Sequence, residues 1–149
     1  DAGQTVNRIV GMFEQEDERQ IRIRLADSIR WIACQRLLPK IGGARVAAFE
    51  ILCTNLRVKD TILHGEAEGK TFYDIIEAGQ PFGMMTFDQS ITELYQKGLV
   101  TEETAISYAS RKAAVGRAVD AVKSARGEKT TSIEDLSIDQ DYTKKYGKM

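Results

Sequence analysis

The segment at residues 65–71 ends with Gly69, Lys70 and Thr71, the same three residue types that end a phosphate-binding loop. Such a loop needs the pattern Gly-x-x-x-x-Gly-Lys-Ser/Thr, because its backbone N–H groups and its lysine must surround the phosphates. The earlier glycine, Gly65, lies four positions before Gly69 instead of five, and two acidic residues between them would repel phosphate. The stretch therefore predicts a solvated turn between two helices and not a nucleotide-binding loop.

His64 is the only histidine of the chain, so a histidine-based metal cluster or a Ser-His-Asp triad cannot be assembled within it. Its place just before a glycine predicts the end of a helix, where a partly charged imidazole is favourable. The acidic run at residues 14–18 is more typical of a solvated face than of a catalytic pair. We therefore predict no catalytic residue and no metal site in this chain.

Cys34 and Cys53 lie in apolar segments, which predicts buried, reduced thiols, although their number also allows one disulfide. No Cys-x-x-Cys pair is present in the sequence, which excludes a cysteine-rich zinc module.

The charge balance and the hydropathy of the chain limit its partners. With 21 basic and 22 acidic residues the net charge is -1, which gives no general attraction to nucleic acid or to an anionic membrane. No apolar run approaches the roughly 18 residues that span a bilayer, and the N-terminus lacks the regions of a signal peptide. We therefore expect a cytoplasmic protein without direct membrane insertion, and we interpret the start at Asp1, without an initiator methionine, as a sign of a fragment.

The spacing of apolar residues predicts an α+β fold that is predominantly α-helical, a helical bundle with a short β-hairpin. The one convincing β signal is Gly42-Gly43 between apolar runs at residues 35–40 and 44–52, with Arg45 and Glu50 expected to be solvated. Thr54-Asn55 and Thr101 are candidate N-caps. Helices are predicted at residues 5–13, from 21 to just before 37, at 56–64, 70–77 and 87–95, after 101 and, more weakly, at 113–122.

Four segments in a fixed order resemble the C-terminal region of PilT-like type IV pilus retraction ATPases of the secretion ATPase superfamily. The similarity runs from residue 1 to about residue 109. The segments are VNRIVGMF (6–13), ACQRLLP (33–39), GARVAAFEI (43–51) and GMMTFDQS (83–90). The resemblance implies that residues 1–55 complete a RecA-like ATPase core, residues 56–126 form a C-terminal helical subdomain and residues 127–149 form a flexible tail.

The resemblance also implies a function for the intact protein. The parent would be a hexameric ATPase that uses ATP and Mg²⁺ to power pilus retraction, with its phosphate-binding loop and catalytic acid upstream of Asp1. This chain would supply interface and force-transmitting helices, contact membrane platform proteins at the pilus base and lie peripheral to the inner membrane. By itself the chain is predicted to have no ATPase activity.

Several residues become candidate sites through this resemblance. Arg8 follows the family's histidine motif and is a candidate sensor of the nucleotide phosphates, whereas Arg57 and Lys59 are candidates for contacts with a subunit or partner. The family's helix Ala-Ile-Arg-Asn-Leu-Ile-Arg carries two arginines, which fall here on Lys59 and Leu63, so retraction does not follow from the family alone. The GMMTFDQS segment adds three interface candidates, Thr86, Asp88 and Gln89.

A different class of function is left open by the sequence, namely a free-standing helical interaction module or a DNA-binding regulator. The predicted helices at residues 87–109 could form a helix-turn-helix. Glu102 and Glu103 then occupy the positions of base-reading residues, which disfavours binding to nucleic acid.

Overall fold

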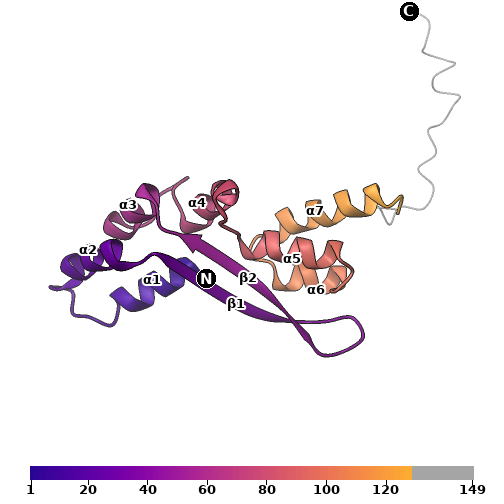
Figure 1. Ribbon diagram of the computed structural model, residues 1–149, viewed down its shortest axis with the longest axis horizontal. Helices are drawn as coiled ribbons and strands as arrows, with labels where there is room; N and C mark the ends of the chain where they lie inside the picture. The colour runs from indigo at the N-terminus through magenta and orange to yellow at the C-terminus, as the bar shows by residue number, and fades with distance from the viewer. Residues whose placement is uncertain (129–149) are drawn as a thin grey trace, which may run out of the picture. The chain divides into compact units, whose positions relative to one another are not determined.

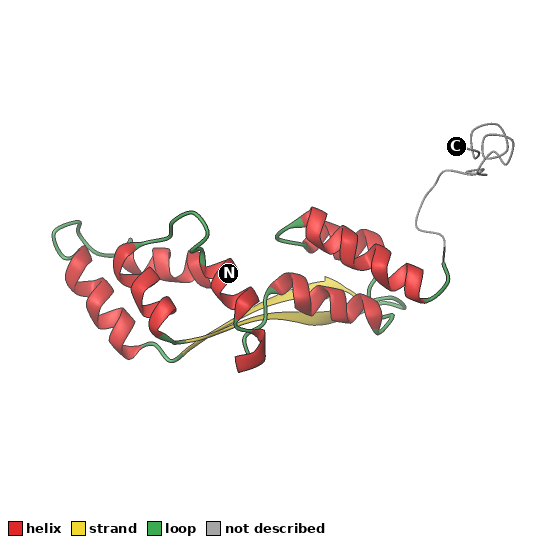
Figure 2. Ribbon diagram, turned by 90° about the horizontal axis from the view of Figure 1, so that it is seen from above, coloured by secondary structure: helices red, strands yellow, loops and turns green. Residues whose placement is uncertain are grey.

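The computed structural model describes residues 1–128 and has a two-stranded antiparallel sheet against which helices pack, which confirms the predicted predominantly helical α+β fold (Figures 1 and 2). The elements are α1 (Ala2–Val10), α2 (Glu18–Ser28), β1 (Trp31–Pro39), β2 (Arg45–Cys53), α3 (Leu56–His64), α4 (Phe72–Ala78), a 3-10 turn η1 (Gln80–Phe82), α5 (Phe87–Gln96), α6 (Glu102–Tyr108) and α7 (Lys112–Ala125).

Strands β1 and β2 form the predicted hairpin, with Trp31 opposite Cys53 at its open end and Pro39 opposite Arg45 next to the turn. The turn contains Gly42 at φ 85° and Gly43 at φ 98°, in the left-handed region that glycine enters without a steric cost. The Gly-Gly signal therefore located the turn correctly.

The predicted long helix from residue 21 to just before residue 37 is wrong in its second half. Helix α2 ends at Ser28, where the N–H of Ile29 closes the last turn on the carbonyl of Leu25 and the backbone becomes extended. The apolar residues that follow fit a helical spacing, but in the structure they alternate between the two faces of β1. Ile32 and Leu38 are buried on one face, while Trp31 and Leu37 are exposed on the other.

Helices α1, α4, α5 and α6 all pack against the hairpin, α5 on β2 and α6 on β1. Near the open end of the hairpin, α1 to α4 enclose a continuous apolar core (Figure 1). Nearer the turn, Leu38 and Ala48 are buried. The core near the open end consists of Ala2, Val6, Val10, Ala26, Ile32, Leu52, Val58, Ile62, Phe72, Ile75, Ile76 and Met84.

The prediction that Glu50 would be solvated is wrong. Its side chain is 3% exposed, and its Oε1 accepts the backbone N–H of Ala2 at 2.8 Å, in the first turn of α1. A carboxylate at a helix N-terminus is favourable because the first N–H groups of the helix have no intrahelical partner. Arg45 is exposed, as predicted.

The predicted helix caps are present. The Asn55 side chain accepts the N–H of Val58 at 2.9 Å, and the Thr101 hydroxyl accepts the N–H of Thr104 at 3.1 Å. His64 is the last residue of α3, as predicted, and its Nδ1 lies 3.0 Å from a carboxylate oxygen of Asp60.

Residues Asp1–Val119 form one compact unit, and a second unit begins at Asp120 within α7. No helix within residues 1–128 is long and apolar enough to cross a membrane. Cys34 and Cys53 are free thiols, as predicted. Both are half-buried, whereas the sequence predicted that they would be buried. The predicted tail at residues 127–149 lies, from residue 129 onward, outside the described residues.

Candidate functional site

Asp88 is the centre of a polar network that joins α4, α5 and the connection between α6 and α7. Its carboxylate is 5% exposed and accepts the backbone N–H groups of Ser110 at 2.6 Å and Arg111 at 2.9 Å. The Tyr73 hydroxyl of α4 donates to the same carboxylate at 2.9 Å. With three donors on its two oxygens, Asp88 is arranged to hold three segments together and not to accept a proton from a substrate.

Arg111 extends this network to the surface. Its guanidinium stacks 3.7 Å from the centroid of the Tyr73 ring and donates to the Asp74 carboxylate at 2.7 Å. The Thr71 hydroxyl and then Arg111 lower the pKa of the Asp74 carboxyl. Burial, followed by the hydrogen bond to Asp88, raises the pKa of the Tyr73 hydroxyl, so Tyr73 stays a neutral donor.

Thr86 and Gln89 form a capping box at the start of α5. The Thr86 hydroxyl accepts the N–H of Gln89 at 3.1 Å, and the Gln89 side chain accepts the N–H of Thr86 at 2.9 Å. Thr86 is fully buried, so the structure gives it a role within the chain. An interface role for Thr86, Asp88 and Gln89 stays a prediction, and Gln89 is the most accessible of the three.

Arg8, the candidate nucleotide sensor, lies in the last turn of α1. Its side chain is exposed and makes no hydrogen bond or ion pair with another residue of the range 1–128. It is therefore available for an anionic ligand, and its sensing role stays a prediction.

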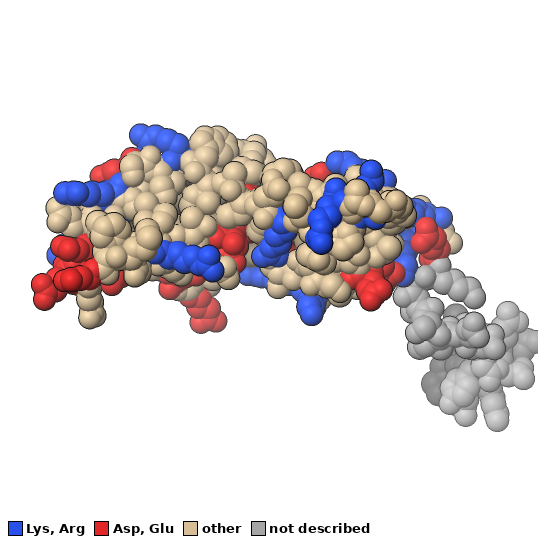
Figure 3. All heavy atoms as spheres, turned by 90° about the horizontal axis from the view of Figure 1, so that it is seen from below, with Lys and Arg blue, Asp and Glu red and all other residues tan. Residues whose placement is uncertain are grey.

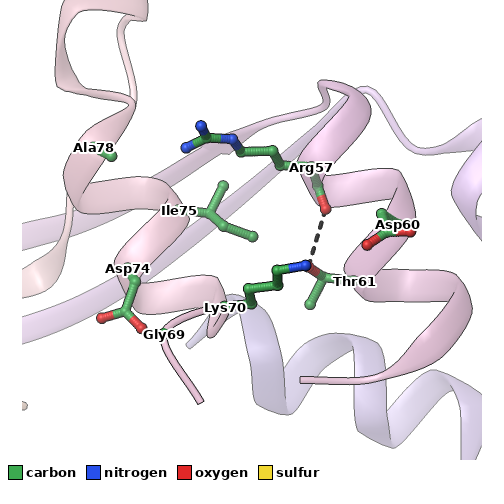
Figure 4. Close-up of a pocket in the computed structure, with 8 residues that line it drawn as sticks. All are labelled: Arg57, Asp60, Thr61, Gly69, Lys70, Asp74, Ile75 and Ala78. Atoms are coloured by element: carbon green, nitrogen blue, oxygen red, sulfur yellow. Dashed lines mark hydrogen bonds between the residues drawn. The ribbon is translucent and has the colours of Figure 1, made fainter. Parts of the chain in front are cut away.

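Arg57 and Lys59 lie on α3 and differ in their surroundings. Lys59 is 3.5 Å from the carboxylate of Asp27 on α2. Arg57 lines a pocket of about 450 Å³ between α3 and α4, together with Lys70 (Figure 4). The structure thus brings Arg57 together with Lys70, while Arg8 and Asp88 lie in other parts of the chain.

The stretch at residues 65–70 forms the predicted exposed turn, closed by a bridge between Ala67 and Lys70. Glu66 accepts the N–H of Phe72 at 2.7 Å, which ties the turn to the start of α4. In the part of the chain that the structure describes, no group of three His, Cys, Asp or Glu side chains could hold a metal ion.

Comparison with known proteins decides the family. The chain is 35% identical over 104 residues to the type IV pilus retraction ATPase PilT of Pseudomonas aeruginosa, and 34% identical over 105 residues to the twitching motility protein of Neisseria gonorrhoeae. Each match covers 70% of this chain. The crystal structure of the pilus retraction motor PilT with bound ADP matches at a TM-score of 0.59 and 32% identity over 76% of this chain. The chain belongs to the PilT-like ATPases.

This PilT-like chain corresponds to the C-terminal part of such a motor, and it spans less than a third of the length of these relatives. It covers 30% of the Pseudomonas protein, 28% of the Neisseria protein and 31% of the crystallised PilT chain. The ATPase DotB of Legionella pneumophila, 21% identical, has the same fold at a TM-score of 0.55 over 70% of this chain and 28% of that chain. No model of a protein family matches the chain.

Four residues of these sites were missed by the sequence analysis. Tyr73 and Arg111 are brought to Asp88 from 15 and 23 positions away, and no local pattern indicates such contacts. Glu50 was missed for the same reason. The sequence analysis considered Lys70 only as part of a phosphate-binding loop. The Thr71-x-x-Asp74 pattern that follows it is a capping-box signal, which places Lys70 just before the start of α4.

Proposed function

We propose that this chain is the C-terminal part of a hexameric ATPase that powers type IV pilus retraction and twitching motility. The observation that carries the proposal is the 35% identity to PilT over 70% of the chain. The 149 residues contain no phosphate-binding loop, so ATP and Mg²⁺ would be bound by an upstream part of the parent protein. The parent would act in the cytoplasm, peripheral to the inner membrane through the pilus machinery.

The outer face of the hairpin supports a place within a larger ATPase domain. Three large apolar side chains on this face are exposed: Trp31 is 59% exposed, Leu37 47% and Phe49 42%. Gln35 and Arg45 are exposed on the same face. Seen from below, much of the surface in Figure 3 is uncharged, with Lys, Arg, Asp and Glu side chains spread between the uncharged areas. Several exposed large apolar side chains on one face are typical of an interface. We propose that the upstream part of the ATPase core covers it.

The candidate residues then divide by task. Arg8 would respond to the phosphates of the nucleotide, because an exposed guanidinium without a partner can bind phosphate oxygens in pairs. Arg57, Lys59 and Gln89 would contact a neighbouring subunit of the hexamer or a membrane platform protein at the pilus base. Thr86 and Asp88 would hold the neighbouring segments in place, Thr86 through the capping box of α5 and Asp88 through its three hydrogen bonds.

Sequencing the reading frame upstream of Asp1 tests the proposal directly. We expect a phosphate-binding loop, an acidic strand and a Thr-Leu-His-Thr ending at the junction. An initiator methionine close to Asp1 would contradict the proposal and leave a self-contained module. The purified 149-residue chain should hydrolyse no ATP above a protein-free blank, and magnesium-dependent turnover by the chain would contradict this division of tasks.

The alternative of a DNA-binding regulator is tested by titration with duplex DNA at two salt concentrations. Glu102 and Glu103 lie in the first turn of α6, where they would face DNA phosphates and bases with negative charge. We expect no salt-sensitive binding at micromolar protein, and a clear salt dependence would favour the alternative.

A further inference from the structure

A pocket between α3 and α4 contains two basic side chains that have no acidic partner within residues 1–128. Arg57 comes from α3 and Lys70 from the turn before α4, and both line the same pocket of about 450 Å³. In Figure 4 the Arg57 side chain extends from α3 toward α4, and the Lys70 side chain extends toward α3. Both cationic side chains therefore line the same pocket, with the Arg57 guanidinium near Ala78 and the Lys70 amine near Thr61.

The two acidic residues of the same pocket already have cationic or donor partners. The Asp60 carboxylate lies 3.0 Å from Nδ1 of His64, and the Asp74 carboxylate is 2.7 Å from the guanidinium of Arg111. Arg57 and Lys70 are thus left to bind an anionic group from outside the described part of the chain.

The pocket continues into an apolar hollow of about 370 Å³, which shares Arg57, Ile75 and Ala78 with it. Leu56 and Phe82 line this hollow and are 85% and 76% exposed, the highest values among the large apolar side chains of residues 1–128. Large apolar side chains at the rim of a hollow are typical of a site that binds another protein.

We propose that this groove binds a peptide segment of a partner protein in which an Asp or Glu lies next to a large apolar residue. The carboxylate would enter the pocket that Arg57 and Lys70 line, and the apolar side chain would pack against Leu56 and Phe82 in the adjoining hollow that shares Arg57. The proposal does not depend on the motor function, because it rests on the charges and exposure of this groove alone.

A peptide fits the groove better than an anionic membrane does. A carboxylate in the recess meets the two cations, whereas a flat anionic surface would also meet the exposed Glu66 and Glu68 of the adjoining turn. A recess of this size accepts a side chain, while a bilayer surface presents no group that would enter it.

Selection from a phage-displayed library of random peptides, about ten residues long, tests the assignment. The library is first depleted on the 149-residue chain carrying Arg57→Gln and Lys70→Gln, and then selected on the unaltered chain. We expect enriched peptides that pair Asp or Glu with Leu, Ile or Phe. Synthetic copies should bind the double variant about tenfold to a hundredfold more weakly, since the loss of one hydrogen bond to a charged group costs about tenfold in affinity.

Two further variants separate the groove from the rest of the surface. Phe82→Ser should weaken the same peptides, whereas Arg117→Gln, at an exposed arginine on α7, should leave their affinity unchanged. Circular dichroism of each variant checks that the fold is intact, as expected for exposed side chains. No enrichment, or enrichment of peptides without acidic residues, would overturn the proposal. Binding to phosphatidylglycerol vesicles that the double variant loses would assign the groove to a membrane surface instead.

Discussion

At the scale of single residues, Asp88 is a buried carboxylate that joins three segments of the chain. It accepts hydrogen bonds from the Tyr73 hydroxyl and from the N–H groups of Ser110 and Arg111. Asp88→Asn removes the negative charge and replaces one carboxylate oxygen with an amide NH2 group. Because this group cannot accept a hydrogen bond, at least one of the buried donors loses its partner. We expect a loss of about 2–4 kcal/mol in the free energy of unfolding, measured by urea denaturation followed by circular dichroism.

The matched control is Asp17→Asn, an exposed residue before α2 whose side chain makes no capping hydrogen bond. This substitution should change the free energy of unfolding by less than about 0.5 kcal/mol. Equal effects of the two substitutions would show that Asp88 does not join the three segments as described.

The lowered pKa of Asp74 predicts how the stability of the chain depends on pH. The Thr71 hydroxyl and Arg111 lower the pKa of Asp74 from its ordinary value of 3.8. A carboxyl whose pKa is lowered on folding adds stability above its unfolded pKa, and this stability is lost as the pH falls through the folded pKa. In Arg111→Gln we expect the pKa of Asp74, measured by NMR titration, to rise toward the ordinary value.

The same titration on Arg117→Gln serves as the control, because this arginine makes no ion pair with Asp74. The acid-induced loss of stability below about pH 4 should also be smaller in Arg111→Gln than in the unaltered chain. An unchanged pKa of Asp74 in Arg111→Gln would contradict the role given to this ion pair.

At the scale of elements, the start of α5 depends on the capping box of Thr86 and Gln89. Thr86→Ala removes both the hydroxyl that accepts the N–H of Gln89 and a buried methyl group. Thr86→Ser removes only the methyl group and keeps the cap. We expect alanine to cost about 1 kcal/mol more than serine in thermal or urea unfolding. Equal costs would mean that packing alone explains the threonine.

The elements also show what the sequence could and could not predict. Caps and turns use contacts within four residues, so the cap at Thr101 and the Gly42-Gly43 turn were predicted correctly, and the cap predicted at Thr54-Asn55 is Asn55. The change from α2 to β1 was missed, because the apolar spacing around Ile29 and Ile32 fits a helix as well as a strand. The burial of Glu50 depends on the N–H of Ala2, 48 residues away, and no local pattern contains it.

At the scale of the whole molecule, the outer face of the hairpin connects the fold with the proposed function. Trp31 lies on this face, is 59% exposed and is the only tryptophan of the chain. If an upstream part of the ATPase core covers the face, the indole passes from water into an apolar interface. The fluorescence of Trp31 therefore reports whether the rest of the protein covers the hairpin.

We expect acrylamide to quench Trp31 efficiently in the 149-residue chain and weakly in a longer protein that carries the upstream ATPase sequence. Any upstream tryptophan is replaced by phenylalanine for this comparison, so that only Trp31 emits. Equal quenching in the short and the long protein would place the upstream part elsewhere and leave this face free for another partner.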